Sequence, residues 1–272
     1  MKVSLLVPTY KDTIALRLIL EALQRQTYKN FEVVIAEDDN ADETKELVKK
    51  FDELEIQHIF QEDNGNRKAT ILNKALSLTQ GEYLIFIDGD TIPFSTFIES
   101  NVALAEPKTV LCGRRVNLGH LVSKDIRAFK KSIPTLEYQY IRHFNYLKKG
   151  GTRHFEQGLR FRPNSMIQRW LMTRNKNVHI VGSNFSCFRE DIFAINGFDE
   201  DITGGSKDDV DLEWRFVMSG CRLKSSKYCA NLFHLDHSRT SRIEDEEIAR
   251  LEMQENQKKQ RFICSNGIQK ID

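Results

Sequence analysis

The strongest constraint on the fold is the alternation, over the first third of the chain, of short apolar runs with longer segments of helical periodicity. The short runs have the length and composition of buried strands, whereas the longer segments repeat apolar residues every three or four positions. Strands that alternate with helices indicate βαβ units, and hence an α/β fold with a mostly parallel central sheet flanked by helices. The predicted strands are Val3–Val7, Phe31–Ala36, Ile56–Phe60 and Tyr83–Ile87, and the predicted helices are Thr13–Gln26, a segment from a cap at Asp42 to about Phe51, and Arg67–Thr79.

Composition excludes several classes of protein. With 272 residues, 40% of them hydrophobic, the chain can bury a sizeable core. A net charge of +1 gives no reason to expect a nucleic-acid partner. The five cysteines form no C-x-x-C pair, which argues against a zinc site and fits a reducing compartment. No apolar run is long enough for a signal peptide or a membrane span, so we expect a cytoplasmic protein, with peripheral contact to the inner face of a membrane left open.

The strand–helix pattern weakens after about residue 115. A helical pattern over Lys124–Tyr146 is interrupted by Pro134, and order returns at Val178–Val181. Between them, residues 142–176 carry nine Lys or Arg and one acid, Glu156. Three interpretations of this basic segment stay open: a solvated insertion, a lid over the donor or acceptor hinged at Gly150-Gly151, and a membrane-surface patch with Trp170. The charged helix predicted over residues 243–262 is typical of a docking element, including one that joins a homodimer.

Two aspartates follow the fourth predicted strand in "YLIFIDGD" (83–90). Residues i and i+2 of an extended chain point to the same face, so Asp88 and Asp90 can present both carboxylates to one point, while Gly89 allows close approach. Oxygen donors of this kind suit Mg²⁺ or Mn²⁺. The simpler alternative is a turn with two solvated aspartates. Glu37-Asp38-Asp39 also follows a predicted strand, and the carboxyl ends of parallel strands share one edge, so we expect the two acidic groups to meet there.

A second acidic cluster lies downstream in "GGSKDDVDLEWRF" (204–216). Asp208, Asp209 and Asp211 open a predicted helix directly after a flexible diglycine. The helix dipole favours acids at this position, which explains one or two of them but not easily all three.

At this point the chain resembles the family 2 glycosyltransferases, which use nucleotide sugars and have the GT-A fold, a Rossmann-like α/β architecture. The later half is similar to the galactosyltransferase-like carboxy-terminal region of chondroitin-polymerising enzymes. The resemblance covers most of residues 1–115 and 178–237. It is carried by "SLLVPTYKD" (4–12), "LQRQTYKNFEVVIAEDDNADET" (23–44), "NGNRKATILNKAL" (64–76), "GEYLIFIDGD" (81–90) and "GFDEDITGGSKDDVDLEWR" (197–215).

The resemblance implies an enzyme: an inverting, metal-dependent glycosyltransferase that moves a hexose from a UDP-sugar to a hydroxyl of a glycan acceptor. Galactose or glucose is favoured as the hexose, and the acceptor glycan is carried by a protein or a lipid. It also implies a nucleotide-sugar-binding half at 1–115, an acceptor-binding half of the same domain at 116–242, and a helical extension at 243–272. The cation would be Mn²⁺ or Mg²⁺.

The roles of single residues follow from the same resemblance. Asp209 corresponds to the catalytic base of an acidic pair completed by Asp208, where the family usually has Glu-Asp. Asp90 corresponds to the main metal ligand, helped by Asp88 and by a histidine of "NLFHLDHSR" (231–239), for which His234 is favoured over His237. The residues expected to bind the donor nucleotide are Pro8, Thr9, Tyr10, Asp38, Arg67, Asp88 and Gly89, with Asp38 on the uracil and Arg67 on the diphosphate or base.

Two alternatives from other classes stay in view. "IFIDGDT" imitates the motif of haloacid-dehalogenase-type phosphatases, with Asp88 as nucleophile, but that motif normally follows the first strand. A non-catalytic sugar-binding module is the other alternative, although unused buried charges are costly. A dinucleotide-binding enzyme is disfavoured because no G-x-G-x-x-G follows an early strand.

Overall fold

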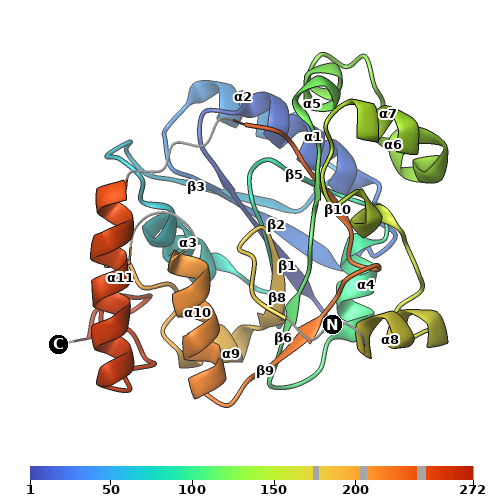
Figure 1. The fold of residues 1–272 in the computed structure, drawn as a ribbon. Coiled ribbons are helices and arrows are strands. Elements are labelled where there is room, and N and C mark those ends of the chain that lie inside the picture. The colour runs from blue at the N-terminus through green and yellow to red at the C-terminus, as the bar shows by residue number, and fades with distance from the viewer. Residues whose placement is uncertain (174–177, 203–206, 238–242, 272) are drawn as a thin grey trace.

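A central sheet of seven strands organises the computed structural model of the chain (Figure 1), which describes residues 1–173, 178–202, 207–237 and 243–271. In this part of the chain the strand order is β3-β2-β1-β4-β8-β6-β9. The first four strands are parallel to one another, and β8 runs antiparallel to β4 and β6. The strands are β1 (Val3–Thr9), β2 (Phe31–Glu37), β3 (Ile56–Phe60), β4 (Tyr83–Ile87), β6 (Thr109–Cys112), β8 (Asn184–Phe188) and β9 (Arg222–Ser225).

Helices cover both faces of this sheet, which is why its central strands are almost continuously apolar. Alternate residues of β1 enter different cores: Leu5 packs with α1 and α4, whereas Leu6 packs with α3, α9 and α10. The predicted α/β fold is therefore confirmed. The helices of the two layers are α1 (Thr13–Gln24), α2 (Asp42–Val48), α3 (Lys68–Leu78), α4 (Phe97–Leu104), α9 (Arg189–Ala194) and α10 (Lys207–Met218).

A small second sheet lies beside the end of β4. It consists of β5 (Thr91–Pro93), β10 (Leu232–His234) and β7 (Val116–Asn117), in the order β5-β10-β7. β10 pairs antiparallel with β5 so that His234 is opposite Thr91, and the Leu235 amide donates to the Asp90 carbonyl at 3.0 Å. This pairing brings a late segment of the chain next to Asp90.

Several element predictions are wrong in detail. Asp42 is not the cap of α2 but its first residue, after Ala41, and the helix ends at Val48. The helix predicted over Lys124–Tyr146 is broken into shorter pieces, since Phe129 has a positive φ of 56° and Pro134 lies in the first turn of a new helix. The pieces are α5 (His120–Arg127), α6 (Ile133–Tyr138), η1 (Tyr140–His143) and α7 (Phe144–Lys149). The C-terminal helix α11 (Ile243–Lys258) ends before residue 262.

The basic segment is ordered over most of its described length, where it contains α7, η2 (Phe155–Gly158) and α8 (Met166–Thr173); residues 174–176 lie outside the described part. Gly150 and Gly151 pack against Gly119, where an added Cβ would clash with the Gly150 carbonyl. The diglycine therefore serves close packing rather than a free hinge. In the part of the chain that the structure covers, no helix has the length and apolar character needed to cross a membrane.

Candidate active site

The candidate site lies at the edge where β1, β2 and β4 end. Asp88-Gly89-Asp90 leaves β4 directly beside the end of β1, and a Cβ on Gly89 would clash with the Pro8 carbonyl oxygen. Glycine is thus required here by close backbone approach. Thr9 is buried next to this contact, so Pro8, Thr9, Asp88 and Gly89 are brought together as the sequence predicts.

Asp90 lies in a cluster with two histidines. Its Oδ2 is 3.2 Å from Nε2 of His237 and 3.5 Å from Nε2 of His234, and one ligand atom from each of the three residues lies within 4.8 Å of the others. Burial and the nearby Asp88 carboxylate raise the pKa of Asp90 to about 6. Among the described residues, no hydrogen-bond partner contacts the buried Asp90 Oδ1. A carboxylate with an unpaired buried oxygen beside two imidazoles fits a divalent cation such as Mn²⁺.

Asp88 is held by two cations, Lys68 and Arg115. Its Oδ1 accepts from Lys68 Nζ at 2.6 Å, and its Oδ2 is 3.8 Å from Arg115 Nη1. Burial opposes ionisation of Asp88, but Lys68 and Arg115 hold its pKa below the ordinary value. The pKa of Lys68 is raised, because the carboxylates of Asp88 and Asp208 outweigh the effect of burial. Lys68 therefore stays charged between two groups of acids.

The acidic pair Asp208 and Asp209 lies in the first turn of α10, close to Lys68. The two residues line a small pocket together with Pro8, Lys68, Gly182 and Phe198. Burial raises the pKa of both, and the Asp208 carboxylate helps to raise the pKa of Asp209 to about 7. The third acid predicted here, Asp211, has a structural use instead: it is buried and pairs with Arg215 Nε at 2.6 Å.

The predicted nucleotide-binding residues are only partly gathered. Asp38 directly follows β2 and is buried. Its carboxylate accepts hydrogen bonds from the Arg67 amide at 2.9 Å and from Gln61 Nε2 at 2.6 Å. The Arg67 guanidinium donates to the Glu62 carbonyl, and the exposed Tyr10 donates to Asp63 at 3.1 Å. We expected the acids of Glu37-Asp38-Asp39 to meet Asp88 and Asp90. This is wrong for Glu37, whose buried carboxylate contacts His58 on β3 at 2.9 Å.

Sequence reasoning missed two cations of this site, Lys68 and Arg115. Lys68 directly follows the arginine that was chosen, and the helix begins at Lys68 rather than at Arg67. Arg115 follows β6, in a stretch where the strand–helix pattern was weak; its Nη1 donates to Ser183 Oγ at 2.8 Å. Only Lys68 could have been found from a local pattern, because it is a basic residue at the start of a helix that follows a strand.

Comparison with known proteins agrees with this architecture. Residues 4–192 match the family model described as glycosyl transferase family 2. Over 82% of its length the chain is 27% identical to validoxylamine A glucosyltransferase from Streptomyces hygroscopicus subsp. jinggangensis, of which it covers 53%. It thus spans about half the length of the first curated relatives that it matches.

Two solved structures have the same fold at low identity. One is mannosyltransferase PcManGT from Pyrobaculum calidifontis in complex with GDP-Man and Mn²⁺, with a TM-score of 0.58, 19% identity, and coverage of 88% of this chain and 58% of that one. The other is S. aureus TarS 1–349 in complex with UDP, with a TM-score of 0.57, 18% identity, and coverage of 86% and 60%. They show that the fold is of the GT-A type.

Proposed function

The chain belongs to glycosyl transferase family 2, and on this premise we propose that it transfers a hexose from a UDP-sugar to a hydroxyl of a glycan acceptor, with inversion at the anomeric carbon. The observation that carries the proposal is the gathering of two acidic groups around one cation. Lys68 contacts Asp88, which is close to Asp90, and it lines the same small pocket as Asp208 and Asp209. Such a site can hold a metal-bound leaving diphosphate close to a base.

The donor would lie over the ends of β1, β2 and β4. Asp38 and the backbone of Pro8 and Thr9 would contact uracil and ribose. Asp90, His234 and His237 would hold the divalent cation, which when bound neutralises charge on the diphosphate. Lys68 is close enough to Asp88 to add a second positive charge on this side.

The acceptor would be activated by Asp209. A pKa of about 7 suits a general base at neutral pH. Asp209 takes the proton of the acceptor hydroxyl as that oxygen bonds to C1 of the sugar. The bond between C1 and the diphosphate oxygen breaks on the opposite face, and its electron pair leaves with UDP. Attack opposite the leaving group inverts the anomeric carbon.

Galactose or glucose remains the preferred sugar, and the similarity to validoxylamine A glucosyltransferase supports a hexose. We propose a protein-bound or lipid-linked glycan as the acceptor. The phosphatase alternative is not favoured, because family 2 membership and the acids of α10 give Asp88 no need to act as a nucleophile. A binding module without activity would leave the Asp208–Asp209 pair unused.

The test is a panel of UDP-sugars, each assayed for release of UDP with Mn²⁺, with Mg²⁺ and in EDTA. We expect turnover of at least one sugar that EDTA abolishes. Asp90→Asn, which keeps the shape but not the charge, should lower the rate by about 10²–10³-fold, whereas Asp39→Asn, a neighbouring acid outside the cluster, should not. Full activity in EDTA would contradict the metal, and no turnover of any nucleotide sugar would contradict the function.

A further inference from the structure

A turn at residues 195–198 joins three parts of the chain that are distant in sequence. This turn, the hub turn, directly follows α9 (Arg189–Ala194). Its Phe198 lines the same pocket as those two aspartates. The position of the hub turn therefore bears directly on the place of the acidic pair.

The C-terminal residues 264–271, here called the clasp, hold the hub turn through Asn196. The buried Asn196 side chain donates to the carbonyls of Cys264 at 2.8 Å and Gln269 at 2.7 Å, and it accepts from the Gln269 amide at 2.8 Å. Its backbone carbonyl accepts from the Ile268 amide at 2.9 Å. Asn196 has a φ of 65°, a left-handed conformation that asparagine tolerates better than most residues.

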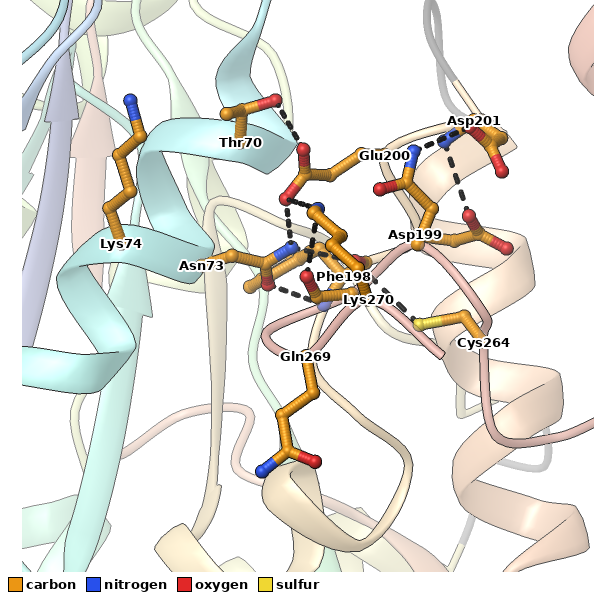
Figure 2. Close-up of polar contacts among 12 residues, drawn as sticks. Thr70, Asn73, Lys74, Phe198, Asp199, Glu200, Asp201, Cys264, Gln269 and Lys270 are labelled. Atoms are coloured by element: carbon orange, nitrogen blue, oxygen red, sulfur yellow. Dashed lines mark hydrogen bonds and ion pairs between the residues drawn. The ribbon is translucent and has the colours of Figure 1, made fainter. Parts of the chain in front are cut away.

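Helix α3 holds the same turn from the opposite side. The buried Asn73 side chain makes two bonds to the Phe198 backbone, at 2.8 Å and 2.9 Å, and one to Glu200 at 2.9 Å. Glu200 also accepts from Thr70 and pairs with Lys270 of the clasp at 2.8 Å. Figure 2 shows these groups converging from α3, the hub turn and the clasp. The same helix carries Lys68 at its first position.

Helix α10 is tied to the hub turn as well. The buried Arg215 donates through Nη1 to the carbonyls of Ile195 at 3.1 Å and Gly197 at 2.7 Å. Helix α10, which carries the acidic pair, is thus fastened to this turn through Arg215, and Phe198 of the turn lines the pocket of the pair. The clasp contacts this turn through Asn196, and none of its residues lines the pocket of the acidic pair.

We propose that Asn196 is a positioning residue: by tying the hub turn to the clasp, it holds Asp208 and Asp209 in the geometry that transfer requires. This rests on the proposed function, because it takes Asp209 as the base. The side chain of Asn196 acts through the hub turn and α10, whereas the donor-binding groups other than Lys68 lie at the ends of β1, β2 and β4 and at β10. Its loss should therefore affect the chemical step and spare donor binding.

The test compares Asn196→Gly with Asn164→Gly in the full chain. Glycine keeps the left-handed backbone and removes only side-chain bonds; Asn164 has a similar φ of 61° but is exposed and lies outside the clasp. In Asn196→Gly we expect kcat for transfer to fall by about 10²-fold with the donor KM within about twofold of wild type, the effect of a misplaced reacting group. Asn164→Gly should match wild type in both constants.

Hydrogen exchange tests the same idea without activity. Amides 208–210 should exchange faster in Asn196→Gly than in Asn164→Gly. Asn196→Ser, whose hydroxyl can replace only part of the Asn196 side-chain bonds, should be intermediate in kcat and in exchange, and it carries the test if the glycine variant does not fold. Unchanged exchange, or a donor KM that worsens as much as kcat, would overturn the proposal. If the wild-type protein transferred no sugar at all, the proposed function would be wrong. Hydrogen exchange in the variants would still show whether the contact of Asn196 with the clasp holds the acidic pair.

Discussion

At the scale of single residues, Asp209 is the group on which the proposed chemistry depends most. Its carboxyl is half-buried, and burial together with the Asp208 carboxylate raises its pKa to about 7. A carboxylate in water would be a weaker base, with a pKa near 4. The environment thus gives Asp209 basicity, but it also makes the ionised form unfavourable in the folded protein.

We predict that Asp209→Asn reveals both effects of the raised pKa, one on the rate of transfer and one on thermal stability. The rate of transfer in wild type should fall as pH drops below about 7, because protonated Asp209 cannot accept a proton; in the variant the rate should be lower by about 10²–10⁴-fold, with UDP affinity nearly unchanged. Since the folded-state pKa is raised, the stability linked to Asp209 is fully present below about pH 4 and is lost as pH rises from there to about 7. The variant should therefore melt higher than wild type at pH 8, and the difference should shrink as pH falls toward 4.

A different result would reassign the base. If Asp209→Asn mainly weakened UDP binding in calorimetry, Asp209 would belong to the donor side, and Asp208 would be the better candidate. Equal melting temperatures at pH 8 would contradict the raised pKa itself.

At the scale of elements, the start of α3 decides which cation faces the acids. Arg67 and Lys68 are adjacent, but the helix turns their side chains in different directions. The Arg67 guanidinium donates to the Glu62 carbonyl, whereas Lys68 contacts Asp88. An arginine has the better geometry for diphosphate, yet at this helix terminus the lysine is the residue that faces the site.

We predict that Lys68→Met lowers turnover of the UDP-sugar far more than Arg67→Met does. Loss of a positive charge near the departing diphosphate should cost about 10²-fold or more in kcat. The two variants are matched in position, chemistry and size, and the measurement is steady-state kinetics at saturating Mn²⁺. A greater loss in Arg67→Met would return the diphosphate contact to Arg67 and would mean that its guanidinium reorients when donor binds.

At the scale of the whole molecule, buried polar groups join α10 to the hub turn and so hold distant segments together. Asp211 and Arg215 are both 1% exposed and pair within α10, while Arg215 also binds the hub turn. Their role is to hold α10 against the rest of the fold. In contrast, the Asp42–Lys45 pair of α2 is on the surface, with Asp42 91% exposed.

We predict that Asp211→Ala lowers the free energy of unfolding by about 3–5 kcal/mol, because it leaves the Arg215 guanidinium buried without its counter-ion. Asp42→Ala, the same substitution in an exposed intrahelical pair, should change it by less than about 1 kcal/mol. Urea unfolding followed by circular dichroism measures both. Similar losses in the two variants would show that water reaches Arg215 and screens its charge.

The parallel half of the sheet and the acidic edge could be predicted from local sequence patterns. The strands from β1 to β4 are encoded by local apolar runs, and Asp88, Asp90 and Asp38 follow those strands directly, so neighbouring residues suffice to place them. The start of α10 at Asp208 and Asp209 was also predictable, because a diglycine and a helical apolar pattern lie next to it. These features depend on interactions within a few residues or on the shared edge of parallel strands.

The other residues that lie beside these acids could be identified only from the assembled fold. His237 and His234 reach Asp90 because β10 pairs with β5, a long-range contact that no local pattern records. Packing between segments that are distant in the chain also decides the direction of Lys68 and the burial of Asp211 beside Arg215. The contact of the clasp with Asn196 depends on it as well. Local periodicity reports which residues prefer to be buried, but the partner that each buried polar group finds is set by the assembled fold.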